Sequence, residues 1–217
     1  VALAPAQDFK RVGDGDTGPN TGGMGAYSPV PSADESVVRT VLDDFVEPTL
    51  AELRRRGIDY RGTLYAGLML TAEGPKLIEY NARFGDPETQ VVVPRMSSDL
   101  AQLLAEAAAG ELLHEPTFVD DACVTVGCAA ELYPSEPRIG DPIEGLDDAR
   151  AVEGVEVFLA GVGHGDGEQL VTAGGRVLWV TGTAPTIEEA RRRAYEGVSL
   201  ISWPGMHHRS DIATDPT

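Results

Sequence analysis

Two oxygen-bearing side chains alternate along a short apolar stretch in the first half of the chain. Glu79 and Asn81 lie in a run that opens with Leu77 and Ile78 and predicts a β-strand. Residues two apart on a strand share a face, so Glu79 and Asn81 should point one way while Ile78 and Tyr80 pack the other way. Two hard oxygen donors on one strand suit Mg²⁺, which takes few protein oxygens and completes its shell with waters and phosphates.

The residues after this strand add a guanidinium and a predicted helix start. Arg83 would follow on the same face if the strand persists, and Asp86 is expected as the N-cap of a helix that has Pro87 at its first position. Strand, turn and helix N-terminus would then lie close together, an arrangement that fits phosphate chemistry. A Glu-x-Asn pair alone is a weak signal, so a solvated polar strand face is the alternative interpretation.

A glycine-rich stretch lies near the start of the chain. Six glycines fall within residues 13–25, interleaved with Asp, Asn and Thr. Glycines let backbone N–H groups converge on an anion, although this spacing fits neither a P-loop nor a dinucleotide-binding turn. By composition alone, an anion-binding loop and an ordered structural loop are equally supported.

Periodicity predicts the elements that position these two stretches. In the first half it predicts a helix over 34–56, paired strands over 63–71 and 75–82, and a helix over 97–109. In the second half it predicts strands over 122–130 and 155–162, a hairpin of 169–173 with 176–181, and a helix over 186–201. Pro48 should kink or split the first helix, Ser97 should cap the second, and Thr186 should open the last with a capping box. Pro116 marks the expected boundary between the halves.

The amino-acid composition limits the kinds of partner and location that this protein can have. The chain has 217 residues and a formal net charge of −18, which argues against nucleic acid as a partner. Lys10 and Lys76 are the only lysines, and an acidic, lysine-poor surface suggests a salt-loving source. Cys123 and Cys128 should lie on opposite faces of a strand as buried, reduced thiols, and no signal peptide or membrane-spanning run is visible. We therefore expect a cytoplasmic protein without a membrane partner.

Two segments resemble one enzyme family closely. The run Arg83–Gln90 and the run Gly18–Pro29 are similar to the motifs of the phosphoribosylamine–glycine ligases, which are ATP-grasp enzymes of purine synthesis. Residues 172–178 and 203–212 resemble the C-terminal domain of the same family more loosely. Phe9 stands where the family usually has His, whereas the Lys10 position matches.

The resemblance implies a fold and a reaction. The implied fold is α+β: the C-terminal part of an ATP-grasp domain over residues 1–115, then a small β-rich domain with one long helix over 116–217. The implied reaction joins glycine to 5-phosphoribosylamine, with ATP converting the glycine carboxylate to an acyl phosphate that the amine attacks. Family chains are about twice as long, so the residues that hold ATP would lie in an upstream half that this sequence lacks.

The resemblance also implies roles for individual residues. Glu79 and Asn81 would hold Mg²⁺ or Mn²⁺, and Arg83 would steady the transferring phosphoryl group. Asp86 would orient Arg83 or the amine, or would only cap its helix. The substrate end would be lined by six residues: Lys10, Asp14, Thr21, Gly22, Gly23 and Met24.

Two other classes of function remain open. Another ATP-grasp carboxylate–amine ligase would share the Glu79 and Asn81 pair but should lack the loop over residues 18–29 as written. A non-catalytic binding module is the second, because this segment alone is expected to be inactive.

Overall fold

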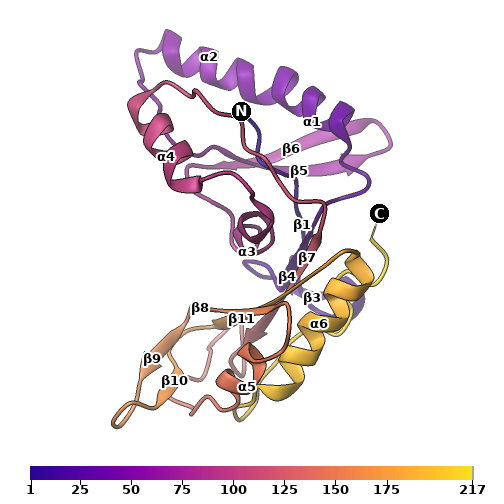
Figure 1. Cartoon of the computed structure of the whole chain (residues 1–217), viewed down its shortest axis with the longest axis vertical. Helices are drawn as coiled ribbons and strands as arrows, with labels where there is room; N and C mark the ends of the chain where they lie inside the picture. The colour runs from indigo at the N-terminus through magenta and orange to yellow at the C-terminus, as the bar shows by residue number, and fades with distance from the viewer. Residues whose placement is uncertain (217) are drawn as a thin grey trace.

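The computed structural model describes residues 1–216 and confirms a mixed α+β fold (Figure 1). Its largest sheet is antiparallel and has the strand order β1-β4-β7-β11-β8. These strands are β1 (Gln7–Asp8), β4 (Gly25–Ser28), β7 (Ala122–Ala129), β8 (Val155–Leu159) and β11 (Arg176–Ala184). The shorter strand pairs are β2 (Arg11–Gly13) with β3 (Thr17–Asn20), β5 (Tyr65–Thr71) with β6 (Gly74–Asn81), and β9 (Val162–His164) with β10 (Leu170–Thr172). The α-helices are α1 (Glu35–Val41), α2 (Glu47–Arg55), α3 (Thr89–Val92), α4 (Leu100–Ala109), α5 (Leu146–Arg150) and α6 (Ile187–Leu200).

The core lies on both faces of β7, all of whose residues are buried. Val124 and Val126 belong to the apolar cluster that α6 covers, whereas Cys123 packs with Val91 of α3 on the other face. Both cysteines are free and buried, as the sequence predicted. A Cβ on Gly182 of β11 would lie 2.2 Å from the carbonyl oxygen of Ala190 in α6. Glycine there lets the helix approach the sheet closely.

The hairpin of β5 and β6 carries the predicted metal donors and is flanked by α1 and α2 (Figure 1). The backbone stays helical from α1 to α2, so Pro48 does not split the helix, but a π-helical turn over Leu42–Val46 lies between the two and Pro48 lies in the first turn of α2. Tyr80 of β6 donates a hydrogen bond to the carbonyl oxygen of Phe45 at 2.9 Å. The π-helical turn is thus where the hairpin meets the helical layer.

Three predicted elements differ from the structure. The helix predicted over 97–109 is α4, which begins at Leu100. Asp99 rather than Ser97 caps it, because the Asp99 carboxylate accepts from two N–H groups of the first turn. The predicted strand 155–162 is two strands that part at Ala160 and Gly161. The predicted hairpin of 169–173 with 176–181 is wrong: β10 pairs with β9, and β11 pairs with β7 and β8.

The last helix agrees with its sequence signals. The hydroxyl of Thr186 accepts from the Glu189 N–H at 3.2 Å, which is half of the predicted capping box. The apolar stripe of this helix is buried throughout: Ala190, Ala194, Val198 and Ile201. Arg191 of the same helix donates to the carbonyl oxygens of Ile212 and Ser210, which ties α6 to the C-terminal segment.

The division at residues 115 and 116 stays a prediction. The hydrogen bonding adds that β1 and β4, from the first half of the chain, pair into the sheet that β7, β8 and β11 of the second half build. Every helix within residues 1–216 is too short or too polar to cross a bilayer.

Candidate active site

The two predicted metal donors lie on β6 as expected. Glu79 stands opposite Gly67 on β5, and Asn81 stands opposite Tyr65. A Cβ on Gly67 would lie 3.1 Å from Cγ of Glu79, so the missing side chain leaves room for Glu79 above β5. The predicted packed face holds for half-buried Tyr80 but is wrong for Ile78, which is 65% exposed.

These two donors suit an ion such as Mg²⁺ that takes most of its ligands from substrate and water. They do not form a metal site whose ligands all come from the protein. In residues 1–216, no group of three or more His, Cys, Asp or Glu side chains could hold a metal. Mg²⁺ commonly binds one or two carboxylates together with substrate phosphates. One carboxylate and one amide oxygen on an open strand match that chemistry, with further oxygens coming from a substrate.

Arg83 and Asp86 do not pair with each other in this structure. Arg83 is exposed and donates to the carbonyl oxygen of Phe84 at 2.8 Å. Asp86 was expected as an N-cap, but α3 begins later, at Thr89, and the Thr89 N–H already has the Gly85 carbonyl oxygen as its acceptor. The carboxylate of Asp86 instead lies 3.3 Å from a guanidinium nitrogen of Arg176. Helix capping by Asp86 is therefore wrong, because another partner holds the side chain.

The glycine-rich loop reaches the same place. Thr21 donates through its N–H and its hydroxyl to the carbonyl oxygen of Lys10, at 2.7 and 2.9 Å, and the same hydroxyl accepts from the Gly23 N–H. A Cβ on Gly23 would lie 2.5 Å from Cδ of Pro87, the residue after Asp86. The two motifs thus touch in the fold, through residues that are 64 positions apart in sequence.

The second of these motifs also contains a buried carboxylate. Glu88 is only 8% exposed and accepts a hydrogen bond from the Tyr65 hydroxyl at 2.7 Å. Burial, and then the charge of Asp8, raise the pKa of Glu88, while the Tyr65 hydrogen bond and the charge of Lys10 oppose this. Burial, and then the charge of Glu88, raise the pKa of Tyr65 as well. Lys10 forms an ion pair with Asp8 at 2.5 Å, which places its ammonium group at this cluster.

Two of the predicted substrate-binding residues have structural partners. Met24 is 1% exposed, and its backbone bonds to Phe9 and Gly127. The carboxylate of Asp14 accepts from the hydroxyl and the N–H of Ser210, at 2.5 and 2.8 Å. The Met24 side chain is buried, whereas Asp14 is exposed and bonded to Ser210, and both residues help to hold the loop that carries the other four. A substrate contact by Asp14 stays a prediction.

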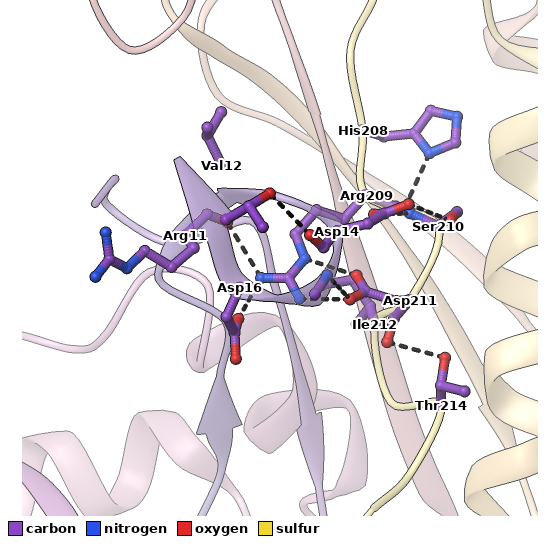
Figure 2. A network of polar contacts seen from close by, with 12 residues as sticks. Arg11, Val12, Asp14, Asp16, His208, Arg209, Ser210, Asp211, Ile212 and Thr214 are labelled. Carbon is purple, nitrogen blue, oxygen red and sulfur yellow. Dashed lines mark hydrogen bonds and ion pairs between the residues drawn. The ribbon is translucent and has the colours of Figure 1, made fainter. Parts of the chain in front are cut away.

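A buried arginine ties the glycine-rich loop to the C-terminal segment, as Figure 2 shows. Arg209 is 1% exposed and forms ion pairs with Asp16 and Asp211, each at 2.7 Å. It also donates to the carbonyl oxygen of Arg11 and lies over the ring of Phe9. Its hydrogen bonds to Asp211 lower the pKa of that carboxyl to about 2.

Sequence reasoning missed several of these site residues. Glu88 and Arg176 both lie inside segments that had been matched to the family, yet no role was assigned to either. A charged residue inside a family motif is a signal that could have identified both of them as site residues. Tyr65 and Asp8 carried no comparable signal, because only the folded chain brings them to Glu88.

The comparisons with known proteins agree with this geometry. The family profile described as phosphoribosylglycinamide synthetase, ATP-grasp (A) domain, matches residues 1–89, and the profile of the C domain of that synthetase matches residues 123–215. A phosphoribosylamine–glycine ligase of Streptomyces coelicolor is 52% identical over 214 residues, which covers 97% of this chain and 51% of the relative. The chain spans about half the length of the curated relatives it matches.

Solved structures give the same result. The crystal structure of a phosphoribosylamine–glycine ligase from Thermotoga maritima has a TM-score of 0.82 and 40% identity, covering 97% of this chain and 51% of that one. N5-carboxyaminoimidazole ribonucleotide synthetase from the same organism has a TM-score of 0.55 at 15% identity, covering 82% of this chain and 45% of that one. At that identity the second likeness reports on fold alone.

Proposed function

This chain belongs to the phosphoribosylglycinamide synthetase family, and on that premise we propose that it is the C-terminal half of an ATP-dependent ligase that joins glycine to 5-phosphoribosylamine. The supporting observation is the convergence of the two motifs, in which Gly23 packs against Pro87 and Arg176 reaches both sides. A carboxylate–amine ligase of this kind has to align the glycine carboxylate with ATP and then with the phosphate-bearing amine, and the arrangement provides side-chain and backbone hydrogen-bond donors for that.

The reaction makes two physical demands, which are alignment and neutralisation of charge. The glycine carboxylate takes the γ-phosphoryl group of ATP, and the amine of phosphoribosylamine then displaces phosphate from the acyl phosphate. Glu79 and Asn81 would hold Mg²⁺ or Mn²⁺, which when bound neutralises phosphate charge. The exposed guanidinium of Arg83 is free to approach the phosphoryl group or the acyl phosphate.

The loop side of the site would bind the two amine-containing substrates. Lys10, Thr21, Gly22 and Gly23 line it, with the Lys10 ammonium held by Asp8. Asp14 and Met24 act behind them by fixing the loop. Asp86 belongs to the site through its ion pair with Arg176. Of the three roles expected for it, we keep orienting the amine, because Asp86 neither pairs with Arg83 nor caps a helix.

The upstream half of the enzyme would be the partner that supplies the ATP-holding residues. This rests on the share of the relatives that the chain covers, about half. A cytoplasmic location is part of the proposal, supported by two buried free thiols of the kind that persist in reducing compartments.

The test is a substrate-omission assay of the full-length enzyme, in which this chain is joined to its upstream half. ADP release should require both glycine and phosphoribosylamine, whereas residues 1–217 alone should release no ADP above background. Release that proceeds with another carboxylate or amine in their place would favour a different ATP-grasp ligase. Absence of ADP release from the full-length protein would favour a non-catalytic binding module.

A further inference from the structure

We infer that Arg176 is a positioning residue that locks the glycine-rich loop onto the Asp86 turn, and so sets the place of the glycine and phosphoribosylamine substrates. The inference rests on the proposed function for the identity of those substrates. The lock itself consists of contacts among residues of this chain and can be tested without turnover.

The guanidinium of Arg176 bonds to both motifs at once. One nitrogen, Nη1, donates to the carbonyl oxygen of Asp86 at 2.9 Å and reaches that of Gly23 at 3.5 Å. The other, Nη2, pairs with the Asp86 carboxylate at 3.3 Å. A planar fork can serve two groups in fixed geometry, which an ammonium group cannot do.

The same side chain leaves no room for another side chain on the loop. A Cβ on Gly22 would lie 2.7 Å from Cζ of Arg176, closer than real Cβ contacts come. Gly22 therefore lies flat against the guanidinium. The need for glycine at this position comes from Arg176, which is 154 positions further along the chain.

Arg176 is itself held from behind by the second half of the chain. Its side chain is only 22% exposed and lies over the ring of Trp179, 5.2 Å from the centroid. The ring of Tyr133 packs against Gly175, where a Cβ would lie 2.4 Å from it, and the Tyr133 hydroxyl accepts from the Gly22 N–H at 3.2 Å. The β-rich half of the molecule thus reaches the site through two neighbouring side chains.

The first test is Arg176→Lys in the full-length enzyme, with Arg192→Lys on the exposed face of α6 as the matched control. Arg176→Lys keeps the charge but loses the fork, so kcat/KM for glycine and for phosphoribosylamine should fall roughly ten- to hundredfold, the loss expected from misplaced substrates. The KM for ATP should stay within about twofold, and Arg192→Lys should match wild type. Equal losses for all three substrates, or no loss, would overturn the inference.

The second test follows the loop directly by amide hydrogen exchange and needs no activity. Exchange in a peptide spanning residues 18–24 should quicken in Arg176→Ala and in Gly22→Ala, while β7 stays protected. Because both changes break the same contact, the double variant should exchange no faster than Arg176→Ala alone. Additive effects, or unchanged exchange in both single variants, would contradict the lock.

The two tests separate this inference from the proposed function. If the full-length enzyme does not use glycine and phosphoribosylamine, the proposed function fails, while the exchange experiment still decides on the lock. If the enzyme turns over normally and loop exchange is unchanged in Arg176→Lys and Arg176→Ala, only the lock fails.

Discussion

Two acidic residues near one turn illustrate how the fold gives similar side chains different tasks. Asp86 remains partly exposed and pairs with Arg176, so its charge is available at the surface of the site. Glu88, two positions later, is buried against Tyr65, and burial raises its pKa. The two carboxylates thus differ in both exposure and partner.

The buried carboxyl of Glu88 should make stability depend on pH. A carboxyl whose pKa is raised by folding binds more protons in the folded state, so the free energy of unfolding falls as pH rises above the usual Glu value of about 4.3. Glu88→Gln cannot ionise and is exempt from this loss. We therefore expect the variant to gain stability relative to wild type between pH 4 and pH 7, as measured by urea unfolding at both values.

Tyr65→Phe is the companion variant for this prediction. It removes the hydrogen bond that opposes the shift, so its stability should fall more steeply than that of wild type over the same range. A difference between Glu88→Gln and wild type that stays constant from pH 4 to pH 7 would show that Glu88 does not titrate as described.

Local alternation in the sequence was enough to predict the shared face of Glu79 and Asn81, because strand geometry fixes it. It could not predict the partner of Asp86. The sequence around Asp86 has the composition of a helix cap, and the competing partner lies 90 positions away. A contact of that range follows from packing of the whole chain, which no local pattern encodes.

At the scale of elements, the glycine-rich loop is shaped by the C-terminal segment rather than by its own composition. Figure 2 shows Arg209 between Asp16 of the loop and Asp211 of the C-terminal segment. Asp14 of the loop bonds to Ser210 from the same segment. The loop is therefore an ordered structure. Composition alone supports an ordered structural loop and an anion-binding loop equally.

Removing the arginine of this cluster should destabilise the protein strongly. Arg209→Leu would leave the carboxylates of Asp16 and Asp211 without their cation. Loss of the partner of a charged hydrogen-bonded group costs about 1–3 kcal/mol, and Asp16, which is 69% exposed, contributes the smaller share. Arg39→Leu, which removes an exposed pair on α1, should change the free energy of unfolding by less than about 0.5 kcal/mol. Urea unfolding of both variants measures this, and equal values would contradict a structural role for Arg209.

The elements that the sequence predicted well are those whose capping residues and apolar periodicity lie within the element itself. The helix over 186–201 has a cap and a continuous apolar stripe, and both are present in α6. The predicted hairpin ending at residue 181 failed because the glycine pair at 174 and 175 is a typical turn signal. In the structure those glycines allow a close approach to Gly161 and Tyr133 instead, and β11 joins the central sheet.

At the scale of the whole molecule, the dominant feature is charge. The formal net charge is −18, and the ion pairs on the surface are made largely by arginine. Self-repulsion of this size weakens the compact state, and salt screens it.

The melting temperature should therefore rise with added KCl. The Debye length falls from about 10 Å at 0.1 M to about 3 Å at 1 M salt, which removes most repulsion between exposed carboxylates. Differential scanning calorimetry from low to molar KCl measures the effect. A melting temperature that is flat or falls with salt would remove the proposal of a salt-loving protein.

The central claim is that Glu79 is a metal ligand in a ligase, and one variant tests it most directly. Glu79→Gln keeps the size of an exposed side chain and removes its charge, so the fold should be retained. Loss of a charge-neutralising ligand should cost several kcal/mol of transition-state stabilisation, at least about a hundredfold in kcat, since about 1.4 kcal/mol is tenfold.

The measurement is kcat of the full-length enzyme at limiting and at high Mg²⁺, with Glu73→Gln at the exposed tip of the same hairpin as the control. We expect Glu79→Gln to lose at least about a hundredfold at limiting Mg²⁺ and to recover part of it at high Mg²⁺, while Glu73→Gln matches wild type. Turnover of Glu79→Gln within a few-fold of wild type at limiting Mg²⁺ would contradict the metal site and leave β6 as a structural strand with a solvated polar face.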